Sequence, residues 1–310
     1  MIIHSNFVGG NIQVVRADGD DVYLKNELRD SGADWFYWAF CVENANNRTL
    51  TFHFDADRLG YFAHHMLYNT DRFYNLAHNY SIEIKELCKT KKGRSVPYIE
   101  FGQGEKTVIL TARHHACEST GDYVLEGVLK HLLETHNKQF RYIAVPFVDY
   151  DGVIDGDQGK GRIPHDHNRD YISDSIYPET QAIMRLAKSS DLIFGCDFHS
   201  PWHKGGENDN CFIVCNDTLH GSEYKTFGDI LESNITDDSF AYRCANNHLF
   251  GTGWNTTSGK QFGCYMNSLG PKVAFKLETA YFGTKNNIFT QDRAVKLGRC
   301  FAKTMLEYLC

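Results

Sequence analysis

The sequence lacks the charge excess and the long apolar runs that mark several classes of protein. Its 32 lysines and arginines are outnumbered by 39 aspartates and glutamates, which gives a formal net charge of -7 at pH 7. That balance argues against a nucleic-acid surface, which needs a dense basic patch. No apolar segment is long enough to cross a bilayer, and no low-complexity tract or internal repeat is evident. We therefore expect neither a nucleic-acid partner nor a membrane partner.

An export signal and a disulfide framework are also missing. Residues 1–6 carry neither a basic region nor a long apolar core, so nothing marks the chain for secretion. The ten cysteines are scattered without a CxxC motif, and several lie inside apolar runs. We expect free thiols and a cytoplasmic protein.

The length and the hydrophobic pattern predict two domains. Up to about residue 85, polar and apolar residues alternate in short segments such as residues 49–54, which predicts a small antiparallel β-sandwich. After Ser81, strand-like runs alternate with helical patterns, which predicts an α/β domain with a mixed, mostly parallel sheet and helices on both faces. We place the N-terminal β domain at residues 1–80 and the second domain at residues 81–310.

A possible metal site begins with His115 and Glu118, which lie three residues apart after the apolar run 107–112. The run is typical of a buried strand, and helical spacing follows from Val124, with Ser119 as a plausible N-cap. The pair therefore lies at the carboxyl end of a strand, where open α/β sheets bind ligands. A catalytic zinc takes three such ligands and a water. Alone, the pair also fits a capped helix beside a surface histidine.

A third ligand is suggested by His199, which ends the apolar run 191–198 and so lies at another strand end. A strand-end histidine bonded to a carbonyl would give the same pattern. His203, His220 and His248 compete for the role, but none follows a comparable strand.

A base is suggested by Glu278, which lies late in the predicted strand 273–279 and shares one face with Ala274 and Lys276. A carboxylate there could face a cleft, or it could be a solvated edge residue. Residues 151–171 form a long loop rich in glycine and charge, of the kind that is often functional. Its Asn168-Arg169 pair could bind a carboxylate, because a guanidinium is planar and can donate two parallel hydrogen bonds. Alternatively, the arginines of this loop could form only surface salt bridges.

Taken in order, these segments resemble the zinc carboxypeptidase family of metallopeptidases, and within it the cytosolic carboxypeptidase branch. The motifs in this chain are His115-Ala116-Cys117-Glu118, Asp166-His167-Asn168-Arg169, Asp197-Phe198-His199 and Leu277-Glu278-Thr279. Residues 93–102 are similar to the family's lead-in to its first catalytic strands. Residues 6–11 and 34–42 resemble the start and the aromatic strand of the branch's N-terminal β domain, so the resemblance covers essentially the whole chain.

The resemblance implies one Zn²⁺ ion bound by His115, Glu118 and His199, with Glu278 as the base that takes a proton from the zinc-bound water. Asp166 matches the carboxylate that orients the first histidine ligand. His114 is not expected to be a ligand.

Substrate contacts follow from the same resemblance. Asn168 and Arg169 match the pair that clamps the substrate's terminal carboxylate. The family's oxyanion-stabilising arginine would fall on Gly159, so Arg162 or Lys160 must take its place, and we favour Arg162 because its rigid fork suits an oxyanion.

The specificity pocket of the family and its mobile tyrosine correspond to the stretch of residues 251–267. Tyr265 is the tyrosine in this stretch, and Lys260 could favour an acidic terminal side chain. The cytosolic branch usually carries Pro-Gly where this chain has Ala116-Cys117, so the local turn should differ, and a thiol beside zinc would make the site sensitive to oxidation.

The resemblance thus implies a zinc metallocarboxypeptidase acting on a peptide or peptide-like substrate with a free C-terminal carboxylate. A related zinc amidohydrolase, cleaving N-acyl amino acids or cell-wall peptides, would share the ligands and the base. A non-catalytic peptide-binding protein on this fold would lack a ligand or the base, and all four residues are present.

Overall fold

A seven-stranded mixed sheet forms the centre of the computed structural model, which describes residues 1–25, 27, 29, 38–44, 49, 51–54, 66–201, 209–236, 242–256, 259–284 and 287–310. The strand order is β11-β12-β10-β8-β9-β7-β6. The strands are β6 (Ile84–Lys89), β7 (Ser95–Phe101), β8 (Lys106–Ala112), β9 (Arg141–Val145), β10 (Asp191–His199), β11 (Phe212–Val214) and β12 (Val273–Glu278).

The parallel part of this sheet is its middle. β12, β10, β8 and β9 pair in parallel, whereas β11 at one edge and β7 and β6 at the other pair antiparallel. Strands β6 and β7 are joined by a tight turn at Gly93, which allows antiparallel pairing, while a whole helix separates β8 from β9. The predicted mixed sheet is confirmed.

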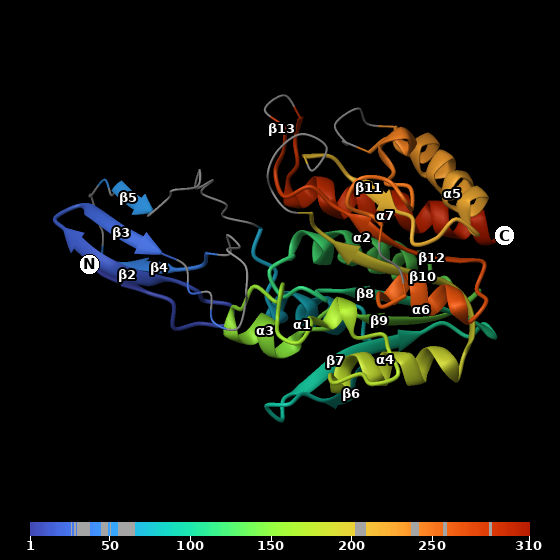
Figure 1. The fold of residues 1–310 in the computed structure, drawn as a ribbon, viewed down its shortest axis with the longest axis horizontal. Coiled ribbons are helices and arrows are strands. Elements are labelled where there is room, and N and C mark those ends of the chain that lie inside the picture. Colours follow the sequence, from blue (N-terminus) through green and yellow to red (C-terminus); the bar gives the residue numbers. More distant parts are fainter. Residues whose placement is uncertain are drawn as a thin grey trace.

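Helices cover both faces of the sheet, as predicted (Figure 1). On one face, α2 (Thr120–Glu134) packs against α7 (Gln291–Leu309) and contacts β8 and β10, and α5 (Gly221–Asn234) packs against α7. On the other face, α4 (Pro178–Lys188) contacts β6 and β10, and α6 (Phe262–Ser268) contacts β10 and β12.

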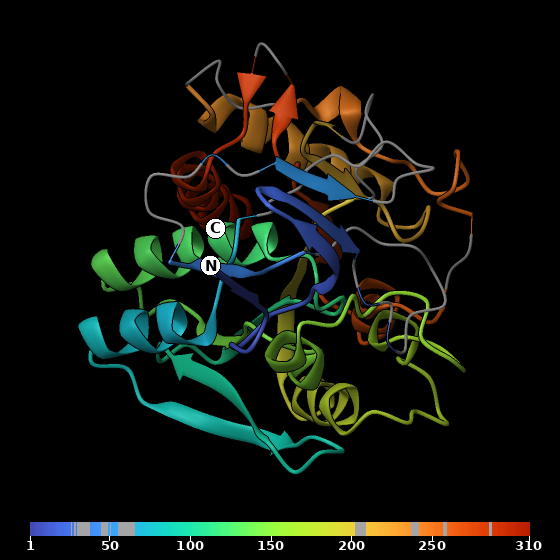
Figure 2. The same cartoon turned by 90° about the vertical axis from the view of Figure 1, so that its left-hand side faces the viewer.

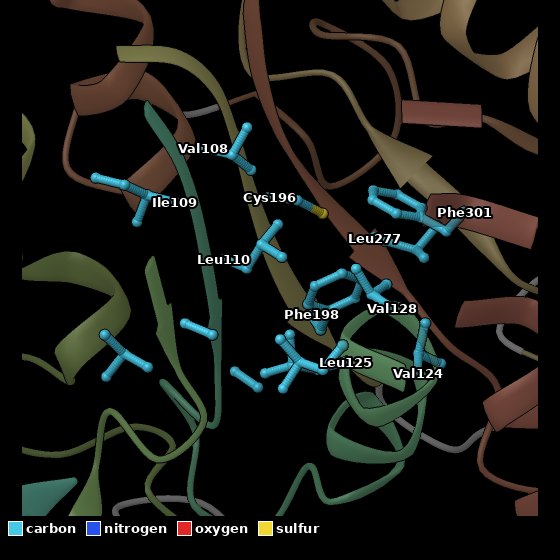
Figure 3. Packing of buried hydrophobic residues seen from close by; sticks show 14 of the residues in the cluster. Val108, Ile109, Leu110, Val124, Leu125, Val128, Cys196, Phe198, Leu277 and Phe301 are labelled. Carbon is cyan, nitrogen blue, oxygen red and sulfur yellow. The ribbon is translucent and has the colours of Figure 1, made fainter. Parts of the chain in front are cut away.

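Burial on both faces explains the apolar central strands. Every residue of β8 after Lys106 is buried, so the strand shows a continuous run without alternation. Figure 3 shows side chains of β8 and β10, among them Leu110 and Phe198, beside Leu125 and Val128 of α2. None of the helices in the described ranges has both the length and the apolar character that a membrane span requires.

The N-terminal strands lie at one end of the molecule and face the viewer in Figure 2. They are β1 (Ile2–His4), β2 (Gln13–Asp18), β3 (Asp21–Lys25), β4 (Cys41–Glu43) and β5 (Thr51–Phe54). β1 pairs with β4 and β2 with β3, both antiparallel as expected. β5 instead joins β3 in parallel, which a long connection permits. Residues 34–37 of the expected aromatic strand lie outside the described residues.

The segment between the two parts contains α1 (Thr70–Asn79), and α3 (Tyr150–Asp155) follows β9. Phe73 of α1 packs edge-on against Phe147, with ring centroids 5.7 Å apart, and belongs to the main core. Helix α1 therefore packs with the larger unit, although it precedes residue 80. The domain boundary at residues 80 and 81 stays a prediction.

Candidate metal centre and substrate cleft

Three parallel strands end side by side and bring the candidate residues together. In the sheet register, Ala112 at the end of β8 pairs with Phe198, and His199 at the end of β10 pairs with Glu278 at the end of β12. The residues that follow β8 are thus next to the last residues of β10 and β12, as expected for the carboxyl edge of a parallel sheet.

His115, Glu118 and His199 form a compact buried cluster. One oxygen of Glu118 lies 3.0 Å from His115 Nδ1, and the other lies 2.6 Å from His199 Nδ1. The candidate donor atoms of the three side chains lie within 4.8 Å of one another. Burial alone would raise the pKa of Glu118, but the Lys160 ammonium and the two imidazoles lower it well below its usual range. A carboxylate between two imidazoles is a donor set suited to Zn²⁺.

Carboxylates also lie against the remote nitrogens of both histidines. Asp166 Oδ1 is 3.6 Å from His115 Nε2, and Asp197 contacts His199 Nε2. Burial would raise the pKa of Asp166, but the neighbouring His115 lowers it below the usual range. This arrangement orients an imidazole and increases its basicity as a ligand.

A second group, His114, Asp197 and His199, also has metal-ligand geometry. His114 uses both ring nitrogens in hydrogen bonds, at 2.8 Å to Asp197 and 2.6 Å to Tyr171 Oη. Asp197 additionally accepts a hydrogen bond from Thr111 at 2.9 Å. Because these hydrogen bonds already use the ring nitrogens of His114 and an oxygen of Asp197, the cluster of His115, Glu118 and His199 is the better metal site.

The turn that carries His115 and Glu118 is fixed by Arg113. Arg113 adopts a left-handed backbone conformation (φ 60°), and its guanidinium donates to the Ala116 carbonyl at 2.6 Å and to Asp122 of α2 at 2.7 Å. Sequence reasoning gave Arg113 no role, although its place directly before the two histidines was visible.

Glu278 and Lys276 are buried side by side on one face of β12, with 6% and 5% exposure. Glu278 Oε2 has no hydrogen-bond partner among the described residues. Burial lowers the pKa of Lys276, although Glu278 acts in the opposite direction. No carboxylate in the described ranges lies within ion-pair distance of the Lys276 ammonium, which is 6.0 Å from the Trp254 ring.

Asn168 and Arg169 lie in the short 3₁₀ turn His167–Arg169, directly after Asp166. Asn168 is buried, and its Oδ1 has no hydrogen-bond partner in the described structure. Arg169 is partly exposed and donates to the Asn168 carbonyl at 3.5 Å, but it is not paired with a carboxylate in the part of the chain that the structure describes.

The two candidate cations in the loop before Asp166 differ in where they point. Lys160 is partly buried, with 13% of its side chain exposed, and its ammonium contacts Glu118. Burial would lower the pKa of Lys160, but Glu118 raises it. Arg162 is instead held by Asp149 at 2.8 Å and by Asp157 at 3.2 Å. Lys160 is thus the cation next to the histidine and glutamate cluster.

The remaining candidates lie outside this cluster. Tyr265, in α6, donates to the Met184 carbonyl of α4 at 3.4 Å, and Lys260 is exposed. His220 is 3.0 Å from Asp217, and His248 packs against Trp254. His203 lies outside the described residues. Cys117 is buried, which raises the pKa of its thiol to about 12.

No family model matches the chain. Among curated proteins it is 24% identical over 255 residues to cytosolic carboxypeptidase 2 of Danio rerio, covering 73% of this chain and 34% of the relative. It is 25% identical over 327 residues to cytosolic carboxypeptidase 3 of Mus musculus, covering 94% and 31%. The chain thus spans about a third of the length of these relatives.

Two solved structures resemble the fold over nearly their whole length. A metallo-carboxypeptidase from Burkholderia cenocepacia superposes with a TM-score of 0.80 at 17% identity, covering 99% of this chain and 98% of that one. A metallo-carboxypeptidase from Pseudomonas aeruginosa, in complex with (2-guanidinoethylmercapto)succinic acid, superposes with a TM-score of 0.77 at 16% identity, covering both chains fully. The chain is thus similar in sequence to cytosolic carboxypeptidases, and its fold is similar to that of metallo-carboxypeptidases.

Proposed function

We propose that the protein is a zinc-dependent metallocarboxypeptidase that hydrolyses the C-terminal amide bond of a peptide or peptide-like substrate. The observation that carries the proposal is the buried cluster of His115, Glu118 and His199 beside Glu278, whose Oε2 lacks a hydrogen-bond partner among the described residues. The names of the sequence relatives support a peptidase that acts in the cytoplasm.

The cluster fits one zinc ion, because its three donors converge and Asp166 and Asp197 lie against the remote nitrogens of the histidines. Bound there, Zn²⁺ would polarise the substrate carbonyl and acidify a water. Glu278 then accepts the proton of that water on Oε2 and delivers it to the leaving amine.

Lys160 is the side chain that we assign to the oxyanion, in place of Arg162. Its ammonium already contacts Glu118, whereas Asp149 and Asp157 both bind the Arg162 guanidinium. A partly buried cation stabilises a developing oxyanion better than an exposed one, because fewer water molecules compete with it. We expect Arg162 to hold the loop that carries Lys160.

Asn168 and Arg169 bind the terminal carboxylate of the substrate. The Arg169 guanidinium is available for this role, because it is not paired with a carboxylate in the described part of the chain. A guanidinium binds a carboxylate through two parallel hydrogen bonds, which fixes the orientation of the chain end.

Lys276 favours a substrate with an acidic C-terminal side chain. A buried ammonium without an ion-pair partner in the described ranges is costly, and a substrate carboxylate would offset that cost. Lys260 was the sequence-based candidate, but it is exposed, where an ion pair contributes little. The mobile-tyrosine role of Tyr265 stays a prediction.

The reaction is tested with zinc-loaded protein and peptides of varied C-terminal residue, with product masses read directly. We expect the loss of one C-terminal residue, and we expect a peptide ending in a carboxamide to resist, because Arg169 then has no carboxylate to bind. Glu278→Gln should lower kcat by about 10²–10⁴-fold while zinc stays bound. Turnover of N-acyl amino acids without any peptide turnover would favour the deacylase instead.

The side-chain preference is tested with Lys276→Met and, as a matched exposed lysine, Lys260→Met. Lys276→Met should lower kcat/KM for a glutamate-ending peptide by at least about tenfold relative to a leucine-ending one, which corresponds to about 1.4 kcal/mol. Lys260→Met should leave that ratio unchanged. A change confined to the Lys260 variant would restore the sequence-based assignment.

A further inference from the structure

The loop that carries Lys160 is held on one side by the N-terminal strands. Asn11, between β1 and β2, is fully buried. Its amide nitrogen donates to the Gly156 carbonyl at 2.7 Å and to the Glu27 carbonyl at 3.1 Å, and its amide oxygen accepts from the Glu27 N–H at 2.9 Å. The Asn11 backbone N–H donates to Ala39 at 2.9 Å. Asn11 is therefore anchored in the N-terminal strands and reaches across to the loop.

The two segments meet backbone to backbone at this point, where the N-terminal chain reaches α3 in Figure 1. The Gly9 N–H donates to the Ile154 carbonyl at 2.9 Å. Gly156 ends α3 in a left-handed conformation (φ 77°), and a Cβ there would lie 2.4 Å from the Gly10 carbonyl oxygen. The contact leaves no room for a side chain at residue 156.

The contact continues toward Lys160 through Asp157. One oxygen of Asp157 lies 3.1 Å from Arg29 of the N-terminal part, and the other lies 3.2 Å from Arg162. Arg29 also contacts the Asp155 carbonyl. Asp157 thus joins the N-terminal strands to an arginine of the loop.

The opposite side of the same segment lies against the metal-ligand turn. The Cys117 N–H donates to the Gln158 carbonyl at 3.1 Å, and a Cβ at Gly159 would lie 2.3 Å from the Ala116 nitrogen. Residues 156–160 are therefore held between the N-terminal strands and the turn that bears His115 and Glu118. Lys160 leaves this segment and contacts Glu118.

We propose that Asn11 and Arg29 are positioning residues, through which the N-terminal strands hold Lys160 at the reaction centre. The N-terminal strands are then a structural part of the active site. The inference rests on the proposed function, because it assigns Lys160 to the oxyanion. A displacement of about 1 Å in a reacting arrangement can lower a rate by about 10²-fold, so loss of this contact should reduce turnover.

The kinetic test compares Asn11→Ala with Val22→Ala. Val22 is buried in the N-terminal cluster with Ile12 and Leu24, away from the polar contacts that Asn11 and Arg29 make with the loop, so its variant weakens the strands alone. Asn11→Ala should lower kcat by about tenfold or more with KM nearly unchanged, whereas Val22→Ala should keep the kcat of the folded protein.

A double-mutant cycle shows whether Asn11 acts through Lys160. Lys160→Ala should lower kcat more than Asn11→Ala does, and the double variant should be no slower than Lys160→Ala alone. Independent, multiplicative effects of the two substitutions would overturn the proposal, and so would an equal loss of kcat in Val22→Ala.

Hydrogen exchange provides a readout that does not need activity. Amides of residues 156–161 should exchange faster in Asn11→Ala than in wild type, and at the wild-type rate in Val22→Ala. If Asn11→Ala does not fold, the same measurement is made on Arg29→Gln, which removes the positive charge that faces Asp157. Unchanged exchange in the loop of the variant would refute the positioning role. If the loop exchanges faster in Asn11→Ala but the wild-type protein has no peptidase activity, the proposed function would be refuted. The role of Asn11 in holding the loop would still be supported.

Discussion

Replacing Gly127 by alanine tests the close packing of α2 against α7, the two helices that cover one face of the sheet. A Cβ at Gly127 would lie 2.0 Å from the Val295 carbonyl oxygen and 3.0 Å from the Cα of Gly298. Since optimal contacts begin at about 3.5 Å, the α7 backbone would have to retreat by about 1 Å or more. Overpacking costs about 1–3 kcal/mol, and the upper end applies because the obstructing atoms are backbone. The higher helix propensity of alanine offsets about 1 kcal/mol of this cost. The free energy of unfolding should therefore fall by about 2 kcal/mol.

The assay is urea unfolding followed by circular dichroism, with Gly221→Ala as the matched control. Gly221 is the first residue of α5, and a Cβ there meets no atom within 4 Å. Gly221→Ala should therefore be neutral or stabilising by up to about 1 kcal/mol. Equal stability of Gly127→Ala and Gly221→Ala would refute the reasoning, because both glycines lie in helices and only Gly127 has backbone atoms in the space of the new methyl group.

Three further substitutions test the surroundings of the site and a surface ion pair. Arg113→Ala leaves its buried carboxylate partner in α2 uncompensated, so unfolding measurements should show a loss of about 3–5 kcal/mol. Asp197→Asn should weaken zinc binding by about 10–100-fold in a chelator competition, because the His199 imidazole loses its orienting carboxylate. Arg299 hydrogen-bonds Glu134 and lowers its pKa to about 2, so this stabilisation is present at neutral pH and is lost as the pH falls from about 4.5 to 2. The thermal midpoints of Arg299→Gln and wild type should therefore converge over that range.

The metal cluster was predictable because its members sit at strand ends. His115, His199 and Glu278 each follow an apolar run, and parallel strands deliver such residues to one edge of the sheet. The order of the strands in the sheet and the pairing of its edge strands could not be predicted from the sequence. β11 pairs antiparallel with β12, and β7 pairs antiparallel with β9, and both pairings join segments that are far apart in the chain.

The cations of the site could not be assigned from spacing. Arg162 and Lys160 are two residues apart, and what separates them is that Asp149 and Asp157 bind the arginine. Lys276 was seen to share a face with Glu278, but Lys260 was the candidate because it lies in the stretch that matches the family's specificity pocket. Lysine is rarely buried, so nothing in the sequence marked Lys276 as a buried cation. The close approach at Gly127 was equally hidden, because a glycine inside a helix shows no sign of its partner.

The two clusters that share His199 differ in what a metal ion would have to displace. In the group with Asp197, a metal would compete with the hydrogen bonds that His114 makes to Asp197 and Tyr171. In the group with Glu118, the carboxylate already faces the Nδ1 atoms of both His115 and His199, and the Lys160 ammonium shows that a positive charge is favourable there. Burial makes the loss of a hydrogen bond expensive, so the buried His114 is better used to hold Asp197 in place for His199. The adjacent histidines thus have different roles. His115 faces Glu118 in the metal site, and His114 holds Asp197, the carboxylate that contacts the His199 imidazole.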